Sequence, residues 1–232
     1  MDKQPTIVTP RVVILMLFFI VVVPMLPLLI SWRWNWWEAW AYALVSILGF
    51  IISRWLAARR NPGLLAERAR FLQHPNAEPW DKILAPLVGL GGGLIPLTAG
   101  LEARFDSPMP FPLIVKSLAL LIILAGYTLG AYALVENRYF SGMVRAQTDR
   151  GQQVVTGGPY RWMRHPGYAG ALLTYFATPF FLDSLWSFLP TAFIFIVLII
   201  RTRLEDQFLQ AKLPGYDEYA RRVCYRLLPG VW

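Results

Sequence analysis

The sequence contains few cysteines, few histidines and little charge. Its 232 residues include one cysteine and two histidines, and charged residues make up only 16% of the chain. The single cysteine, Cys224, excludes an internal disulfide and a cysteine-based zinc cluster, and we interpret it as a packing residue. His165 has no partners for a metal site, so no metal is predicted, and we interpret His74 as an exposed loop residue. So little charge also excludes an ordinary soluble domain.

Apolar residues dominate what remains. Hydrophobic residues make up 56% of the chain, and the mean hydropathy is positive. Six apolar segments stand out, at about 11–31, 37–57, 83–101, 112–135, 168–182 and 185–200. A helix that rises about 1.5 Å per residue needs about 20 residues to cross about 30 Å of hydrocarbon. We therefore predict an all-α, polytopic transmembrane helical bundle of five or six spans, with six as the working number.

The first and the last two apolar segments are special cases. The first ends in a tryptophan-rich stretch at 32–37 that is typical of a membrane interface, so it predicts a retained span rather than a cleaved signal. The last two segments are short and nearly continuous. They predict a tight helical hairpin that need not cross the membrane completely.

The net charge of +8 is distributed as in a membrane protein. All 22 lysines and arginines except Arg33, Arg104 and Lys116 fall on one side of a six-span bundle. The segments on that side are 1–11, 54–82, 136–164 and 201–232. This asymmetry predicts a multi-pass protein with both termini cytoplasmic, in the inner membrane of a prokaryote or the endoplasmic reticulum of a eukaryote. The basic residues form no patch interleaved with stacking aromatics, so we expect lipid headgroups and no nucleic acid as partners.

Glycines inside the apolar segments predict close helix packing. Gly126 and Gly130 form a G-x-x-x-G pair, which favours a notch within the bundle over a dimer seam. Gly91 and Gly92 lie in a run that lets a neighbouring helix approach closely. The oligomeric state stays open, a homo-oligomer included.

Polar and aromatic residues that suggest chemistry are concentrated after residue 135. We therefore divide the chain into four N-terminal spans at 1–135 and a core at 136–232 that carries the chemistry. The segment from Phe140 to Tyr168 contains several turn-forming glycines and predicts an irregular inner loop, with Pro166 starting the next helix. A helix N-terminus beside Arg164 favours an anion. The alternative is that the arginines bind lipid headgroups and the aromatics form an interfacial belt.

The end of the last apolar segment carries a second candidate pair. If the helix continues past residue 200, Arg201 and Glu205 lie on one face at i and i+4. They could form an ordinary ion pair within the helix. Alternatively, Glu205 binds the ammonium group of a ligand and Arg201 binds a carboxylate, and the spacing leaves both interpretations open.

These motifs together resemble a known family. The motifs are Tyr160-x-x-x-Arg164-His165-Pro166-x-Tyr168-x-Gly170, Arg201-x-x-x-Glu205-Asp206, Gly215-x-x-x-Tyr219 and Leu227-Leu228-Pro229-Gly230. They resemble the isoprenylcysteine carboxyl methyltransferases, which belong with the phospholipid methyltransferases to a group of membrane-embedded methyltransferases. The resemblance covers about residues 136–232, and the N-terminal spans share only their apolar character.

The resemblance implies S-adenosylmethionine as the methyl donor, in a cytosol-facing cofactor pocket formed by the loop and the C-terminal helices. Glu205 would bind the amino group of this donor, and Arg201, with Arg164, would face the acceptor as the catalytic residues. The other implied cofactor-binding residues line the pocket: Gln147, Gln152, Gln153, Val154, Val155, Tyr160, His165, Pro166, Gly167 and Tyr168. The chain departs from the family at Gln152, where a histidine is frequent, and at Asp206, where a second glutamate is frequent.

The predicted function is that of an integral membrane S-adenosylmethionine-dependent methyltransferase. The predicted acceptor is the carboxylate of a lipophilic, isoprenylcysteine-like or prenylated molecule, which is ionised at neutral pH and needs no general base. Methylation of a phospholipid amine is an alternative that would need Glu205 or His165 as the base. A sterol-type reductase using NADPH is another. A non-catalytic transporter is disfavoured because ionisable residues are nearly absent from the middle of the spans.

Overall fold

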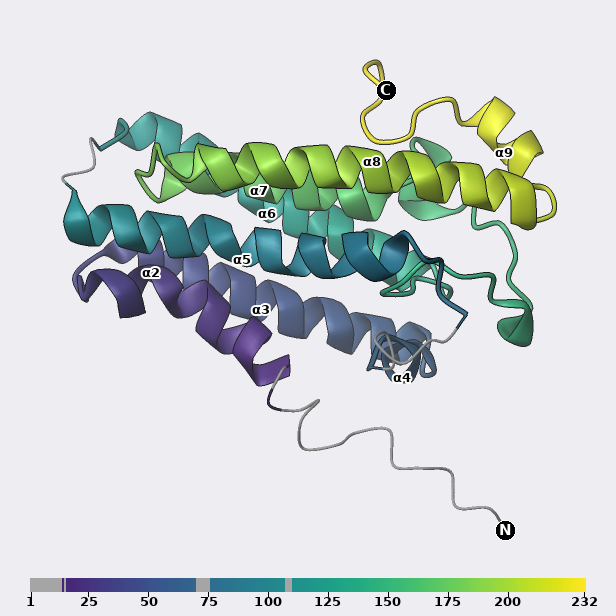
Figure 1. Ribbon diagram of the computed structural model, residues 1–232, viewed down its shortest axis with the longest axis horizontal. Helices are drawn as coiled ribbons and strands as arrows, with labels where there is room; N and C mark the ends of the chain where they lie inside the picture. Colours follow the sequence, from purple (N-terminus) through teal and green to yellow (C-terminus); the bar gives the residue numbers. More distant parts are fainter. Residues whose placement is uncertain (1–13, 15, 70–75, 107–109) are drawn as a thin grey trace, which may run out of the picture.

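The computed structural model describes residues 14, 16–69, 76–106 and 110–232. The start of the first predicted span and His74 lie outside these residues. The chain is all-helical as predicted, and no strand occurs in the described ranges (Figure 1). In chain order, the elements are η1 (Phe18–Val22), α2 (Val23–Ser31), α3 (Trp37–Arg60), α4 (Leu64–Ala69), α5 (Asp81–Phe105), α6 (Leu113–Glu136), η3 (Thr148–Arg150), η4 (Gly158–Arg161), α7 (Pro166–Phe181), α8 (Phe188–Lys212) and α9 (Tyr216–Arg222).

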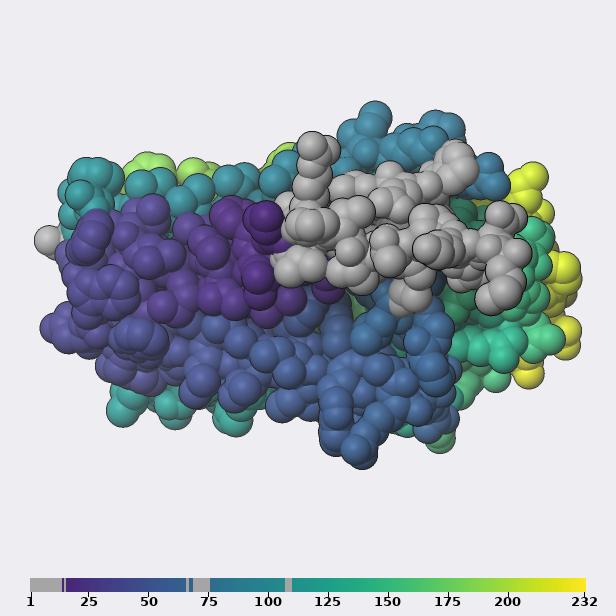
Figure 2. Space-filling view, turned by 90° about the horizontal axis from the view of Figure 1, so that it is seen from below, coloured from purple at the N-terminus to yellow at the C-terminus, as the bar shows by residue number. Residues whose placement is uncertain are grey.

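The long helices run side by side along the longest axis of the molecule (Figure 1). The most extensive packing joins α6 to α7, α2 to α5, α5 to α8, and α3 to α6. The view from below shows α2 and α3 adjacent on one face of the bundle (Figure 2). The connections α2–α3, α5–α6 and α7–α8 lie at one end, which we call the turn end. The loop at 137–165, α4 and α9 lie at the opposite end, which we call the loop end (Figure 1).

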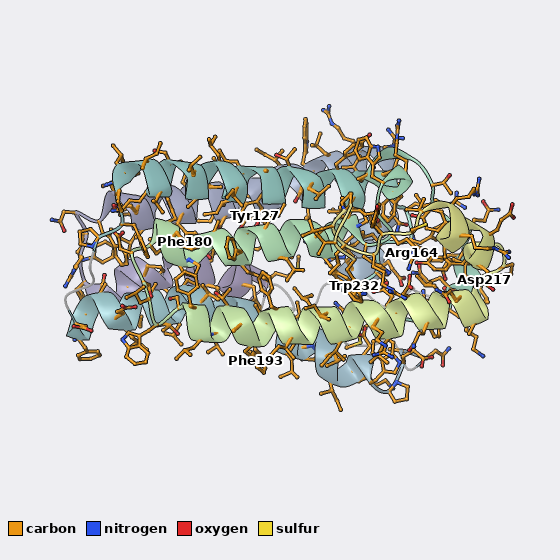
Figure 3. The ribbon with its side chains drawn as sticks, turned by 90° about the horizontal axis from the view of Figure 1, so that it is seen from above. Tyr127, Arg164, Phe180, Phe193, Asp217 and Trp232 are labelled. Carbon is orange, nitrogen blue, oxygen red and sulfur yellow. The ribbon has the colours of Figure 1, made fainter. Side chains whose placement is uncertain are left out.

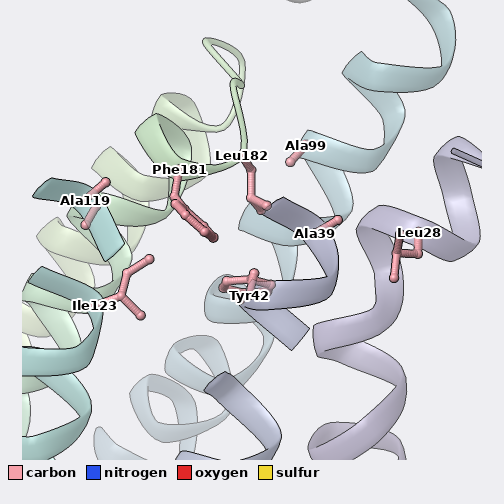
Figure 4. Packing of buried hydrophobic residues seen from close by; sticks show 9 residues of the cluster. Leu28, Ala39, Tyr42, Ala99, Ala119, Ile123, Phe181 and Leu182 are labelled. Atoms are coloured by element: carbon pink, nitrogen blue, oxygen red, sulfur yellow. The ribbon is translucent and has the colours of Figure 1, made fainter. Parts of the chain in front are cut away.

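Apolar side chains from several helices meet in the core near the turn end. Leu28 of α2, Tyr42 of α3, Ile123 of α6 and Phe181 of α7 belong to one cluster of buried residues (Figure 4). Leu28, Ile123 and Phe181 have no exposed surface. In a membrane, close van der Waals packing of such side chains favours the association of these helices.

Glycines bring α6 and α7 into close contact. A Cβ atom at Gly126 would lie 2.5 Å from the carbonyl oxygen of Gly170, and one at Gly170 would lie 2.8 Å from the nitrogen of Gly130. The predicted notch within the bundle is therefore confirmed. A Cβ at Gly91 would likewise lie 2.8 Å from Ile194 on α8, as the glycine run of that span predicted.

Buried ionic contacts join the helices at the turn end. Lys116 of α6 lies 2.5 Å from both Glu38 of α3 and Asp183 of the α7–α8 turn. Glu102 of α5 accepts hydrogen bonds from the hydroxyl of Ser184 and from the backbone nitrogen of Trp186 in that same turn. An unpaired charge would be costly to bury here, and each of these charged groups has a partner. Their contacts join α3, α5 and α6 to the α7–α8 turn.

Three helices, α3, α5 and α6, are long and apolar enough to cross a membrane. The predicted hairpin corresponds to α7 and α8, but α7 has 16 residues, about 24 Å at about 1.5 Å per residue, which is less than the hydrocarbon core. The outward face of α8 is apolar up to Ile200 and includes Phe193, which lies on the outer side of the bundle (Figure 3). The number of five or six spans and the cytoplasmic placement of the termini stay predictions.

Candidate functional site

A cavity of about 430 Å³ lies at the loop end, and we call it the main pocket. Every predicted cofactor-binding residue lines it except Pro166: Gln147, Gln152, Gln153, Val154, Val155, Tyr160, His165, Gly167, Tyr168 and Glu205. Both predicted catalytic residues, Arg164 and Arg201, line it as well. Figure 3 shows nitrogen- and oxygen-bearing side chains gathered at this end, around Arg164 and Asp217. Pro166 instead begins α7, as predicted.

Hydrogen bonds within the loop give its irregular backbone a fixed shape. The Gln147 amide donates to the carbonyl of Tyr139 at 2.8 Å, and the Gln152 side chain accepts from the backbone nitrogen of Gln147 at 2.9 Å. The Tyr139 hydroxyl donates to the carbonyl of Gly151 at 2.7 Å. A loop without regular structure needs such side-chain hydrogen bonds to satisfy its backbone groups. Gln147 and Gln152 supply them and thereby shape the pocket wall.

A buried arginine anchors the same loop to α4. Arg145 donates to Glu67 of α4 at 2.8 Å and to Asp149 at 2.7 Å, and only 7% of Arg145 is exposed. Such two-sided pairing positions both segments, because the planar guanidinium fixes the direction of each hydrogen bond.

The start of α7 places an aromatic pair beside Glu205 of α8. The His165 and Tyr168 rings are nearly parallel, with centroids 5.8 Å apart. The Tyr168 hydroxyl donates to Glu205 at 2.5 Å. This is the only hydrogen bond of the Glu205 side chain in the described part of the chain. One oxygen of a pocket-lining carboxylate is therefore available to a ligand.

Asp206, the neighbour of Glu205, is instead fully buried and joins four segments. It accepts from Arg164 at 2.7 and 2.9 Å, from Arg226 at 2.8 Å and from the Tyr216 hydroxyl at 3.0 Å. Burial raises the pKa of Asp206, but the hydrogen bonds from His165 and Arg164 outweigh it and hold the pKa below its ordinary value. Asp206 is therefore a carboxylate that fixes the loop, α9 and the C-terminal residues to α8.

The two predicted catalytic arginines differ in how much of their guanidinium is engaged. Besides Asp206, Arg164 donates to the carbonyl oxygens of Ala220, Val223 and Cys224 at 3.2, 2.7 and 3.2 Å. These contacts favour a structural role for Arg164. Its catalytic role stays a prediction.

Arg201 pairs with a residue from a distant part of the chain. Its Nε and Nη2 donate to the carboxylate of Asp81 at 2.7 and 2.9 Å, and Nη2 also donates to the carbonyl of Gly142 at 3.0 Å. The ion pair of Arg201 is thus with Asp81 of α5, and not with Glu205 within the same helix. Its Nη1 makes no hydrogen bond among the described residues. Arg201 also lies 5.2 Å from the centre of the Tyr168 ring.

Tyrosines supply much of the remaining wall. Tyr160, Tyr216 and Tyr219 all line the main pocket, and burial raises the pKa of each above its ordinary value. At neutral pH they are uncharged, so they offer ring faces and hydroxyl groups rather than anions.

Several pocket residues were not predicted from the sequence. Arg54 and Arg68 contribute to the wall from α3 and α4, and Tyr216 contributes from α9. The pocket therefore draws on both sides of the predicted division at residue 135. The position of Arg54 near the inner end of an apolar span was the one available signal. Across the described ranges, no group of three histidine, cysteine, aspartate or glutamate side chains could hold a metal.

A bundle with membrane-length apolar helices and a polar pocket at one end is the architecture of a membrane-embedded protein that acts on a small ligand. Comparison with known proteins supports that class. Residues 113–214 match the phospholipid methyltransferase family, a family of membrane methyltransferases, so the predicted resemblance is confirmed for this segment. The match covers α6, the loop, α7 and α8, which provide most of the site.

The chain is also similar to the Delta(14)-sterol reductase TM7SF2 of Mus musculus. The identity is 29% over 152 residues, which is 60% of this chain and 36% of the mouse protein. The chain therefore spans little more than a third of the length of that relative.

Proposed function

We propose that this protein is a membrane-embedded S-adenosylmethionine-dependent methyltransferase that methylates a carboxylate of a lipophilic acceptor. The observation that carries the proposal is the half-satisfied carboxylate of Glu205, which faces the main pocket among aromatic rings. The match of residues 113–214 to a methyltransferase family supports the same reaction class.

The residues present fit the methyl donor. S-adenosylmethionine carries an ammonium group and a sulfonium, and it supplies an activated methyl group when bound. Glu205 has one oxygen available for the ammonium, and the ring faces of Tyr160, Tyr168 and Tyr216 attract a cation. The cavity of about 430 Å³ lies within the range of small-molecule sites.

The chain's own contribution to such a reaction is alignment. When bound, S-adenosylmethionine would supply a methyl group to an acceptor oxygen and would leave as the thioether S-adenosylhomocysteine, which keeps the electron pair of the broken carbon–sulfur bond. A carboxylate has no proton to lose, so no base is required. Asp81 holds Arg201, whose Nη1 makes no hydrogen bond to the described residues and would orient the acceptor carboxylate. Positioning of this kind supplies a large part of the rate enhancement in displacement reactions.

The membrane setting follows from the same proposal. The lipophilic part of the acceptor would lie among the apolar helices, and the donor would enter from the cytosol at the loop end. Membrane lipids would cover the outward faces of α3, α6 and α8, where large apolar residues are exposed.

A reductase that uses NADPH is the second candidate, because the mouse relative is a sterol reductase by name. Side-by-side titration of the detergent-purified protein with S-adenosylmethionine, S-adenosylhomocysteine and NADPH distinguishes the two. Micromolar binding of the first two ligands alone supports the methyltransferase, whereas NADPH binding alone supports the reductase.

The site assignment is tested in the same titration. Glu205→Gln should weaken S-adenosylmethionine binding at least tenfold, because a charged hydrogen bond is lost. The control is Asp217→Asn, which changes an exposed carboxylate at the same end and should bind as the wild type does. Unchanged affinity of Glu205→Gln would remove Glu205 from the site.

A further inference from the structure

The main pocket extends beyond the predicted donor site into the space between α3, α6 and α7. Its deeper wall includes Phe50 of α3, Tyr127 and Leu134 of α6, and Tyr175 of α7. Two arginines lie on this part of the wall, Arg54 near the loop end of α3 and Arg68 on α4. The pocket is thus apolar in its depth and positively charged on the α3–α4 side.

In the described part of the chain, the hydrogen bonds of both arginines go to neutral groups. Arg54 donates to the Ser53 hydroxyl at 3.0 Å and lies 4.1 Å from the centre of the Phe50 ring. Arg68 donates weakly to the carbonyl oxygens of Phe140 and Ser141 at 3.3 and 3.4 Å. Within the described residues, neither takes part in an ion pair.

Three carboxylates of α4, α5 and α6 at this end are already paired with other cations. Asp81 pairs with Arg201, Glu67 pairs with Arg145, and Glu136 pairs with Arg60. Burial and the charge of Arg201 lower the pKa of Arg68 to about 10, yet Arg68 remains protonated at neutral pH. Among the described residues, no carboxylate pairs with the positive charge on this side of the pocket, and burying such charge is unfavourable unless an anion accompanies it.

We propose that Arg54 and Arg68 form an anion subsite that binds a second acidic group of the acceptor, apart from the carboxylate that Arg201 orients. Naming the ligand as the acceptor rests on the proposed methyltransferase function. The apolar depth beside the two cations fits an amphiphile with a hydrocarbon chain and a terminal oxyanion, either a carboxylate or a phosphate. Glu205 would bind the cationic donor and the two arginines an anionic group of the acceptor, so opposite charges of the ligands would be bound by opposite charges of the protein.

The test measures binding of matched amphiphiles to the full chain in non-ionic detergent. The probes are dodecanoate, dodecyl phosphate and dodecanol, which share a chain and differ in the terminal group. The wild type should prefer at least one anion to the alcohol, and the preferred anion identifies the source of the oxyanion. Arg54→Gln and Arg68→Gln should each weaken anion binding about tenfold or more, as expected for the loss of a charged hydrogen bond, and leave dodecanol unchanged.

Controls separate this subsite from general surface charge and from misfolding. Arg59→Gln removes an exposed arginine of the same helix, outside the pocket, and should bind all probes as the wild type does. S-adenosylmethionine binding should be unchanged in Arg54→Gln and Arg68→Gln. Arg54→Lys and Arg68→Lys keep the charge and should retain most of the anion affinity. If a glutamine variant does not fold, these lysine variants still test whether positive charge at the two positions binds the anion.

Three results would overturn the proposal. In the first, the wild type binds the anions and the alcohol equally well. In the second, both glutamine variants keep the preference for the anion. In the third, the glutamine variants lose NADPH binding but bind the amphiphiles as the wild type does. The last result would assign the arginines to a nucleotide phosphate. Failure of the wild type to bind S-adenosylmethionine, with anion preference intact, would refute the methyltransferase function and leave the anion subsite standing.

Discussion

Arg201 and Asp81 are 120 residues apart in the chain, yet Arg201 donates two hydrogen bonds to the Asp81 carboxylate. Asp81 also accepts from the backbone nitrogen of Val144 at 2.6 Å, and Arg201 binds the carbonyl of Gly142 at 3.0 Å. One buried ion pair therefore joins α5, α8 and the pocket loop. This pair makes the shape of the site depend on the N-terminal helices.

Asp81→Asn should destabilise the protein by about 3–5 kcal/mol, because it leaves the Arg201 charge buried without a partner. Arg201→Gln should cost a similar amount. Both variants should also reduce S-adenosylmethionine affinity indirectly by loosening the loop. Thermal or denaturant unfolding in detergent gives the stabilities.

The double variant Asp81→Leu with Arg201→Met tests whether the ion pair is the cause. It should lose clearly less stability than the sum of the single variants, since the pair is removed without leaving a lone charge. Strict additivity would mean that the two residues stabilise the fold independently.

Tyr168→Phe should weaken S-adenosylmethionine binding by about two- to tenfold, less than the loss expected for Glu205→Gln. The phenylalanine keeps the ring face but removes the hydrogen bond that orients Glu205. Tyr132→Phe, at an exposed tyrosine outside the pocket, is the matched control. Equal losses in the Tyr168 and Glu205 variants would mean that the hydroxyl, not the carboxylate, is the main ligand group.

The sequence was sufficient to predict what depends on local pattern. The apolar segments predicted the helices, Pro166 predicted the start of α7, and Gly126 with Gly130 predicted a close helix contact within the bundle, without naming α7 as the partner. Each of these follows from residue type and spacing within one segment. The loop residues that the motif resemblance named, apart from Pro166, line one pocket, and their binding of the cofactor stays a prediction.

The sequence could not predict pairings between distant segments. Arg201 has Glu205 one helical turn away, and the spacing left open whether the two form a pair within the helix; the fold places Asp81 beside Arg201 instead. Arg54 and Arg68 were interpreted only as inner basic residues, because spacing along the chain does not tell which of them face a cavity. Such relationships depend on how the helices pack, which no single segment encodes.

Gly126→Ala should destabilise the bundle by about 1–3 kcal/mol. The added methyl would lie 2.4 Å from the Thr174 hydroxyl and 2.5 Å from the Gly170 carbonyl oxygen, so α6 and α7 must move apart. The matched control is Gly89→Ala on α5, where a Cβ meets nothing within 4 Å. Comparable melting temperatures for these two variants would contradict the α6–α7 contact.

Asp206→Asn should remove a pH-dependent part of the stability. The folded-state pKa of Asp206 is below the value of about 3.9 expected in the unfolded chain, so the carboxylate stabilises the fold above about pH 4. This stabilisation is lost as the pH falls below that value, since the unfolded chain then binds the proton more readily than the folded one. The wild type should therefore melt at a clearly higher temperature than Asp206→Asn at pH 7.

The difference between wild type and Asp206→Asn should narrow when melting is measured from pH 5 down to pH 3. Asp217→Asn, which changes an exposed carboxylate, should follow the wild type throughout. The asparagine cannot carry the charge that pairs with Arg164 and Arg226. The lower melting temperature of the variant at neutral pH therefore reports the joint strength of those two contacts. A constant difference at every pH would show that Asp206 contributes through shape and neutral hydrogen bonds alone, and its role as a charged hub would then be wrong.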